Sequence, residues 1–332
     1  MRRPLGIAAA LILALLAGSL AGCPNAGEDR ILAVSATGVV RGLVYFDLNG
    51  TLAPDQGDDS LKDVRVKLVT KGTRDSIAGA SSLASGIFRF AGVQVGTYVV
   101  IVDSTSVGDS AMVVKQDSTE VTVPPGDSVA VNIGISFPRV SIAEARALPP
   151  GRKVFVEGVA LNARDNFRDT TLHVQDTSGA VRVTRVRSAG VFTGDSIRLR
   201  GTVSRRSGLP SLDDVTVFSL GVAFLPTASQ ITTAQAATAQ GGSLDAMQAV
   251  VLNATINDTL TVGNDFRLTV DDGSGVLEVL LDATADAAFR VPLLPGVYVP
   301  GNAFDIVGIL VPTGSAGLWR LKPRSAQDLV RR

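Results

Sequence analysis

The stretch VQDTSGAVRV at residues 174–183 decides the fold, because it returns as VDDGSGVLEV at residues 270–279, an offset of 96. Both copies place β-branched and apolar residues on either side of Asp, Ser and Gly, which is typical of two strands joined by a tight turn. A second pair extends the repeat, since GDSIRLRGTV at 194–203 matches GNAFDIVGIL at 301–310, an offset of 107. The growing offset predicts an insertion at about residues 283–300, and the repetition indicates two copies of one domain.

Further elements are predicted around these segments. Alternating, β-branched strands lie at residues 153–161, 171–174, 180–186, 196–203 and 215–220. Five strands over about 75 residues favour a small Greek-key barrel. A short helix is predicted before each copy, at 141–148 and 231–239, and the first begins with the capping-box pair Ser141 and Glu144.

The two copies resemble extracellular bacterial OB-fold domains, which occur beside secreted nucleases and in lipoproteins. The resemblance rests on the leading helix, the two aligned segments, VFVEG at 154–158 and LKPRSAQD at 321–328, and it covers nearly all of 140–330. The second copy has Asn253 or Ala254 where the first has Gly158, so its first strand departs from the pattern. The resemblance implies two OB-type barrels, at residues 139–221 and 222–332.

The segment from 37 to 138 is also a β domain. Its segments 39–46, 64–69 and 98–102 alternate with period two, and Pro138 marks its end. The runs GLVYFDLNG (42–50), LKDVRVKL (61–68), SGIFRF (85–90) and VGTYVV (95–100) resemble a prealbumin-like surface domain. They are similar to the B-repeat domains of Gram-positive adhesins and to carboxypeptidase regulatory-like domains, which implies a spacer or adhesive stalk. The predicted fold class is all-β: one prealbumin-like β-sandwich followed by two small OB-type Greek-key barrels, each with a short leading helix.

The amino-terminal segment has the pattern of an export signal. Arg2 and Arg3 precede an apolar run at 5–20, so residues 1–22 are predicted to be a signal peptide. LAGC at 20–23 is similar to the lipobox of bacterial lipoproteins, which implies a thioether-linked lipid on Cys23, cleavage before it and acylation, as by palmitate, of the new amino terminus. Residues 23–36 then form a lipidated tether. Because Pro24 follows the cysteine, the outer membrane or cell surface is the favoured location of this extracytoplasmic, membrane-anchored lipoprotein.

Composition argues against most kinds of catalysis. Cys23 is the one cysteine, so no disulfide or thiolate cluster can form within the chain. His173 is the one histidine, which disfavours His-metal sites and Ser-His-Asp triads, and its strand predicts a surface or half-buried position. No phosphate loop, zinc motif or nucleophile elbow occurs. We therefore predict no enzyme and no catalytic residue. Lys+Arg and Asp+Glu both number 31, so there is no clear nucleic-acid signal.

An acidic loop is the candidate metal site. Hard oxygen ligands, as calcium requires, come from five residues within a short stretch: Asp47, Asn49, Asp55, Asp58 and Asp59. Adhesin B-repeats bind calcium through a comparable loop, so the resemblance implies a structural calcium ion, the one cofactor considered. The EF-hand spacing is absent, and the alternative is a hairpin loop in which Asp, Asn and Gly supply turn geometry.

Arginines of the first barrel are the candidate ligand-binding residues. Residues 139–220 hold 13 Lys and Arg against 8 Asp and Glu, whereas 222–332 hold 7 against 10. Ile197 and Leu199 are predicted to point into the barrel, which puts their neighbours on the outer face. The candidates are Arg182, Arg185, Arg198 and Arg200. They would attract an anionic polymer, or they form an ordinary solvated strand face.

The sequence thus predicts a lipid-anchored envelope or surface protein that acts as a non-enzymatic interaction, adhesion or display module. The alternative is an accessory binding protein whose first OB domain captures an anionic oligosaccharide or oligonucleotide. The expected partners are the membrane, through the lipid on Cys23, and an envelope polymer or another envelope protein.

Overall fold

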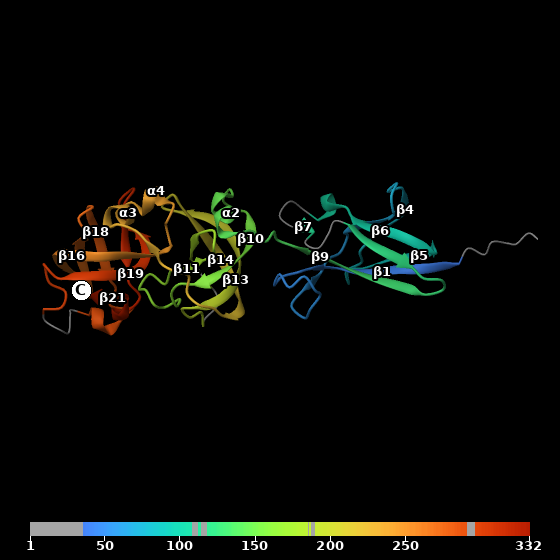
Figure 1. Ribbon diagram of the computed structural model, residues 1–332. Helices are drawn as coiled ribbons and strands as arrows, with labels where there is room; N and C mark the ends of the chain where they lie inside the picture. Colours follow the sequence, from blue (N-terminus) through green and yellow to red (C-terminus); the bar gives the residue numbers. More distant parts are fainter. Residues whose placement is uncertain (1–35, 108–111, 114–117, 185, 187–189, 291–295) are drawn as a thin grey trace, which may run out of the picture.

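The computed structural model describes residues 36–107, 112–113, 118–184, 186, 190–290 and 296–332, which form three β units in a row (Figure 1). The predicted signal peptide, the lipidation site Cys23, nearly all of the tether and Arg185 lie outside the described residues. Within the described part of the chain, no helix is long and apolar enough to cross a membrane. The predicted fold class, a sandwich followed by two barrels, is confirmed, and the domain boundaries stay predictions.

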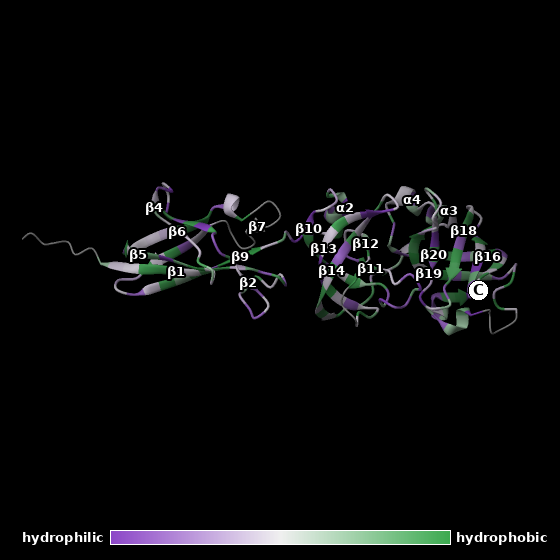
Figure 2. Ribbon diagram, turned by 180° about the vertical axis from the view of Figure 1, so that it is seen from behind, coloured by the Kyte–Doolittle hydropathy of each residue, from purple (hydrophilic) through white to green (hydrophobic). Residues whose placement is uncertain are grey.

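The first unit is a sandwich of two sheets. One sheet has the order β2 (Asp59–Ser60), β1 (Thr37–Phe46), β9 (Ser128–Ser136) and β7 (Met112–Val113), with β5 (Ile87–Gln94) also paired to β1. The other has the order β4 (Ser76–Ser81), β3 (Arg65–Thr70), β6 (Gly96–Val102) and β8 (Ser118–Val123). Hydrophobic and hydrophilic residues alternate along these strands (Figure 2). Every second residue along a strand therefore points into the core between the two sheets. This core includes Val40, Val44, Leu68, Phe88 and Val100.

The second unit is a closed barrel. Its strand order is β10 (Lys153–Ala160), β11 (Leu172–Gln175), β12 (Ala180–Val183), β14 (Leu209–Val222) and β13 (Asp195–Arg206), which pairs again with β10. β12 and β14 run parallel, whereas the other neighbours are antiparallel. Helix α2 (Ile142–Ala147) leads into this barrel and has the predicted capping box at Ser141 and Glu144. We call this unit the first barrel.

The third unit repeats this order. Strands β16 (Gln248–Val262), β17 (Asp265–Asp271), β18 (Val276–Leu281), β20 (Trp319–Lys322) and β19 (Ala303–Pro312) close because β19 pairs again with β16. β18 and β20 are the parallel pair. Short elements flank the barrel: β15 (Ser229–Gln230), α3 (Thr233–Ala237), α4 (Ala239–Gly242), η2 (Ala287–Phe289), η3 (Ala326–Asp328) and β21 (Leu329–Arg331). The same parallel pair in the same position confirms that this second barrel is a copy of the first.

The repeated turn has a structural role in both copies. In the first, Asp176 Oδ2 accepts from the Ile142 amide at 2.9 Å and Ser178 Oγ accepts from the Ala143 amide at 3.0 Å. In the second, the Asp272 carboxylate and the Ser274 hydroxyl accept from the first two amides of α3, each at 3.1 Å. The turn therefore satisfies amides that the leading helix leaves free at its start, and it fixes that helix on the barrel.

The first strand differs between the copies, as the sequence suggests. At Gly158, a Cβ atom would lie 2.8 Å from the carbonyl oxygen of Gln175, so only glycine fits. The second barrel has a β-bulge instead, where the register shifts between Val251 and Ala254 and Asn253 has a φ of +51°. The extra residue of the bulge lets a strand without glycine bend at this point.

Candidate functional site at the junction of the sandwich and the first barrel

The loop after β1, residues 47–58, is organised by one buried carboxylate. Asp47 is fully buried, and it accepts from the amides of Gly50 at 2.6 Å, Thr51 at 3.1 Å and Leu52 at 2.9 Å. Three amide donors compensate for the cost of burying this charge. The carboxylate thus fixes the conformation of the segment, which we call the junction loop.

The other acidic side chains are also held by donors of the chain itself. Asp55 accepts from the Asn49 amide group at 2.8 Å and from the Gly57 amide, and these bonds lower its pKa. Asp58 accepts from the Leu48 and Asp55 amides, although burial raises its pKa. Asp59 lies exposed on β2. Among the described residues, no group of three or more His, Cys, Asp and Glu side chains is placed to hold a metal. The calcium site stays a prediction.

The arginine face packs against this loop. Ile197 and Leu199 are buried inside the barrel, as expected, so their neighbours project outward. Arg198 Nη1 donates to the carbonyl oxygens of Asn49 at 3.0 Å and Gly50 at 2.8 Å. Arg200 Nη1 donates to the Leu48 carbonyl oxygen at 2.7 Å. The structure therefore brings the predicted calcium loop and two of the predicted ligand-binding arginines into direct contact.

Gly50 has a conformation that favours glycine where the loop meets the barrel. Its φ is +73°, a conformation that residues with a side chain rarely adopt, and a Cβ there would lie 3.2 Å from Arg198 Cδ. Its carbonyl oxygen also accepts from Arg139 Nη2 at 2.7 Å, so two guanidinium groups converge on one peptide. The positive φ and this close approach together disfavour a residue with a side chain at this position.

A row of aromatic rings crosses the same junction. Phe46 of the sandwich lies edge-to-face against Phe137 with centroids 5.1 Å apart. Phe137 contacts Phe155 of the first barrel at 6.4 Å, and Phe155 contacts Phe218 at the same distance. Such pairs contribute about 0.5–1.5 kcal/mol beyond their buried area. The junction therefore combines arginine-to-carbonyl bonds with a continuous apolar seam.

Arg182, another candidate ligand-binding residue, is buried where the first barrel contacts the second barrel. All residues of β11 and β12 are buried, and Arg182 Nη2 lies 3.5 Å from Oδ2 of Asp245, which precedes the second barrel and is fully buried. Arg146 of α2 donates to the carbonyl oxygens of Asp245 and Gly242, and Trp319 Nε1 donates to Asp245 Oδ1 at 2.7 Å. We call this contact the barrel junction. It covers the outer face of β11 and β12 in the first barrel.

His173 also lies at the barrel junction, so the prediction of a surface or half-buried position is wrong. Only 1% of the residue is exposed, and its ring packs edge-to-face against Phe167, whose own ring is covered by Lys322 of the second barrel. Its Nδ1 donates to Asn162 Oδ1 at 3.0 Å, whereas the buried Nε2 has no hydrogen-bond partner among the described residues. Burial lowers the pKa of His173 to about 3; Asp169 opposes this shift, and Lys322 and Arg182 add to it.

This buried imidazole predicts acid sensitivity. The unfolded chain binds a proton at His173 below about pH 6.5, whereas the folded chain stays neutral, so stability is complete above that pH and falls as the pH decreases. We expect the free energy of unfolding to drop by about 2 kcal/mol between pH 7 and pH 5, at most about 1.4 kcal/mol per pH unit. Urea unfolding over this range measures the slope. For His173→Gln, the free energy of unfolding should depend less on pH by that amount. Equal pH dependence in the native chain and the variant would contradict this account.

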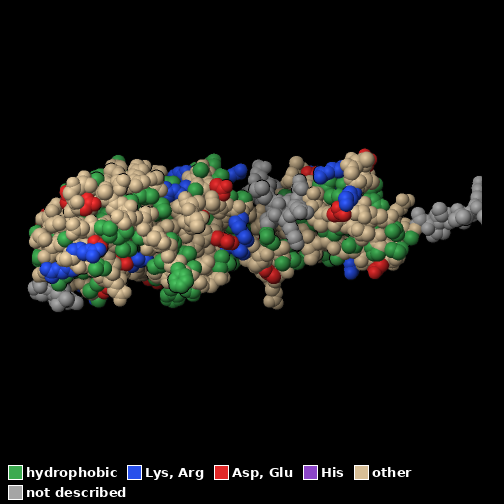
Figure 3. Space-filling view, in the orientation of Figure 1, with side chains coloured by type: hydrophobic (Ala, Val, Ile, Leu, Met, Phe, Trp, Pro, Cys, Tyr) green, Lys and Arg blue, Asp and Glu red, His purple; other side chains and the backbone are tan. Residues whose placement is uncertain are grey.

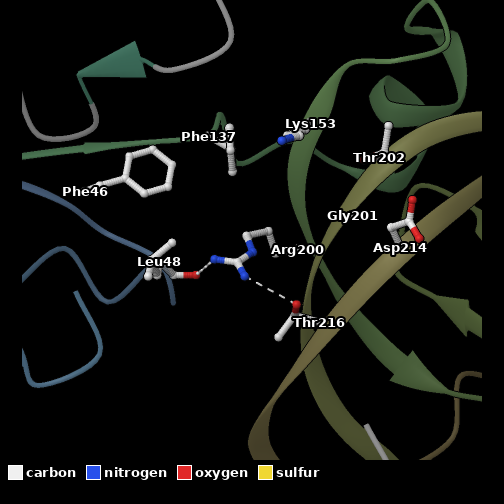
Figure 4. Close-up of a pocket in the computed structure, with 9 residues that line it drawn as sticks. All are labelled: Phe46, Leu48, Phe137, Lys153, Arg200, Gly201, Thr202, Asp214 and Thr216. Atoms are coloured by element: carbon white, nitrogen blue, oxygen red, sulfur yellow. Dashed lines mark hydrogen bonds between the residues drawn. The ribbon is translucent and has the colours of Figure 1, made fainter. Parts of the chain in front are cut away.

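A pocket of about 390 Å³ opens beside the contact between the sandwich and the first barrel, which we call the first junction. Figure 4 shows Phe46, Leu48 and Phe137 on its sandwich side, with Arg200 in the middle and Lys153 near Phe137. Thr202, Asp214 and Thr216 line the barrel side. Of these residues, only Arg200 was a candidate from the sequence. We call this space the junction pocket.

Comparisons with known proteins give limited similarity. No protein-family model and no curated protein matches the chain. Among solved structures, the chain is similar to the minor pilin GBS52 of Streptococcus agalactiae, with 19% identity and a TM-score of 0.24 over 31% of this chain and 45% of that one. It is similar to the pilus 2b backbone protein of group B streptococcus at 14% identity and a TM-score of 0.22, over 30% of this chain and 41% of that one.

A third similarity is to a murine DNA-binding protein bound to double-stranded DNA. The identity is 10% and the TM-score 0.29, over 51% of this chain and 90% of that one. The chain spans less than half the length of the two pilins that it matches. At these values the similarities carry no functional argument, so the function is argued from the geometry of the chain itself.

Proposed function

We propose that this chain is a non-enzymatic, lipid-anchored envelope protein that displays its second barrel on a rigid stalk made of the sandwich and the first barrel. The observation that carries this proposal is that both junctions are closed by buried or half-buried arginines of one unit bound to the backbone of the next. Arg198 and Arg200 do so at the first junction and Arg146 at the barrel junction. A flexible string of domains would leave such groups to solvent.

The outline of the molecule supports a stalk. Figure 3 shows the three units as one elongated body, with the amino-terminal end of the sandwich and the second barrel at opposite ends. A tether of about 14 residues would reach about 45–50 Å from a membrane when extended. A lipid at Cys23 would therefore hold the sandwich nearest to the membrane and the second barrel farthest from it.

The second barrel offers an open face at that far end. Its strands β17 and β18 correspond to β11 and β12, yet they alternate between buried residues and residues that are partly or fully exposed. Arg267 and Arg320 lie there on either side of Glu278. The face that is covered in the first barrel is thus available in the second for contact with an envelope protein or polymer.

The anchoring part of the proposal is tested in a bacterial host that receives the chain with its own signal segment. We expect metabolic labelling with palmitate and recovery in the membrane fraction, and an epitope inserted at Gly263 between β16 and β17 should be reached by antibody on intact cells. Cys23→Ser should abolish the label, whereas Ser35→Ala in the tether should keep it. A Cys23→Ser chain that still takes up palmitate would refute the lipid anchor.

A further inference from the structure

A lysine of the first barrel lies at the edge of the junction pocket. The Lys153 ammonium is exposed and lies 5.5 Å from the centroid of the Phe137 ring. Within the described part of the chain it takes part in no salt bridge. Because aromatic rings attract ammonium groups, Phe137 holds this side chain at the edge of the pocket. A positive charge is therefore positioned at the edge of a pocket whose far side carries the Asp214 carboxylate.

A second cation is fixed on the floor of the same pocket. Arg200 Nη1 is bound to the Leu48 carbonyl oxygen at 2.7 Å, its Nη2 lies 3.4 Å from Thr216 Oγ1, and the guanidinium lies 5.9 Å from the Phe218 ring centroid. These contacts fix the position of the guanidinium group, and none of them is with a carboxylate. Figure 4 shows Lys153 and Arg200 extending toward the same space. A carboxylate between them would meet two positive groups that are already oriented.

The rest of the lining differs between the two sides. Phe46 and Phe137 form an apolar wall on one side, and Thr202 and Asp214 present oxygen atoms on the other (Figure 4). Hydroxyl and carboxylate groups of this kind exchange hydrogen bonds with the hydroxyls of a sugar. A sugar ring also has C–H groups that pack on the negative face of an aromatic ring.

We infer that the junction pocket binds a carboxylate-bearing sugar, that is, one uronic-acid residue of an acidic polysaccharide. Its carboxylate would lie between Lys153 and Arg200, its ring against the two phenylalanines, and its hydroxyls toward Thr202 and Asp214. A neutral sugar would bring no negative charge to either cation. A volume of about 390 Å³ is within the range of about 300–1,000 Å³ typical of small-ligand sites. The site goes beyond the display function and does not depend on the lipid.

The position of the pocket gives binding a structural consequence. Phe46 and Leu48 belong to the sandwich, whereas Lys153, Thr202 and Thr216 belong to the first barrel. A ligand that contacts both sides adds a further link across the first junction. A ligand that binds the folded state but not the unfolded state also raises the melting temperature of the chain by mass action. The inference therefore has a readout, thermal stability, besides affinity.

The experiment is calorimetric titration of the chain, purified in detergent, with trigalacturonic acid, neutral galactotriose and a short polyglutamate peptide. We expect trigalacturonic acid to bind with an affinity that falls as salt is raised, and the neutral trisaccharide to bind at least about 10-fold more weakly. Lys153→Ala should weaken binding about 10-fold or more, and Thr202→Val about 3- to 10-fold. Lys67→Ala, which removes an exposed lysine from β3 of the sandwich, should change nothing.

Melting curves of each variant show that the fold is intact before affinities are compared. Equal binding of the neutral and acidic trisaccharides would overturn the inference, as would a Lys153→Ala chain that binds like Lys67→Ala. Polyglutamate binding of equal strength and equal Lys153 dependence would show that the pocket selects carboxylates without regard to the sugar, and it would also refute the saccharide assignment.

Discussion

Asp245→Ala is expected to lower the free energy of unfolding by about 3–5 kcal/mol, because it leaves a buried guanidinium without a counter-charge. Arg182 has a side chain that is 11% exposed, and its Nη2 lies 3.5 Å from the fully buried Asp245 carboxylate. The two groups form an ion pair without a directed hydrogen bond, since among the described residues neither Arg182 Nη2 nor Asp245 Oδ2 has a hydrogen-bond partner. The same substitution removes the acceptor of Trp319 Nε1.

Equilibrium unfolding in urea measures this effect, with Asp258→Ala as the matched control at an exposed aspartate on β16. The double variant Arg182→Met, Asp245→Leu should recover most of the lost stability, because it removes both charges and keeps apolar volume at the barrel junction. If Asp245→Ala shifted the unfolding midpoint no more than Asp258→Ala does, the barrel junction would not depend on this ion pair.

The architecture was accessible from the sequence because it rests on local signals. Period-two alternation predicted the strands, and the repeated turn at Asp176 and Asp272 predicted two copies of one domain. Both signals depend on residues close together in the sequence. The alternation indicates which side chains enter a core, and the turn is closed by hydrogen bonds to its own side chains. The capping box at Ser141 belongs to the same class of local signal.

The candidate site could be predicted from the sequence only in part. The strand pattern shows that a side chain faces outward from its own domain, but it does not show which other domain covers that side chain. Arg198 and Arg200 were correctly placed on the outer face, yet that face is covered by carbonyl oxygens of the junction loop. The error at His173 has the same origin, since its outward-facing ring is covered by Phe167 and that ring in turn by Lys322 of the second barrel. Asp245 gave no signal at all, because it lies in an irregular segment before β16 where no periodicity applies.

Lys153 and Phe137 of the junction pocket were equally hidden. Lys153 is the first residue of a strand and Phe137 lies just after another, so no motif connects them in the sequence. Their proximity is a product of how the sandwich is docked on the barrel. Contacts between domains are non-local and depend on shape, which is why a single sequence predicts each domain better than the joint between two of them.

The double variant Arg198→Ala, Arg200→Ala should free the sandwich from the first barrel. It removes three guanidinium-to-carbonyl bonds to Leu48, Asn49 and Gly50, and bonds to charged groups contribute about 1.5–3 kcal/mol each when buried. Because both residues are partly exposed, we expect a combined loss of about 3 kcal/mol from the junction. Small-angle scattering should then show a wider distribution of molecular dimensions, and protease should cleave faster near Pro138.

Arg152→Ala is the control, because Arg152 is an exposed residue just before β10 and should leave the scattering curve unchanged. Arg198→Lys with Arg200→Lys separates charge from geometry. Lysine keeps the positive charge but lacks the planar guanidinium with which Arg198 binds Glu157 through Nε and two carbonyl oxygens through Nη1, so this chain should be intermediate. A double alanine variant that scatters like the native chain would assign the rigidity to the aromatic row from Phe46 to Phe218 instead. In that case Phe137→Ala should loosen the stalk, and if neither change does so, the rigid display of the second barrel is refuted.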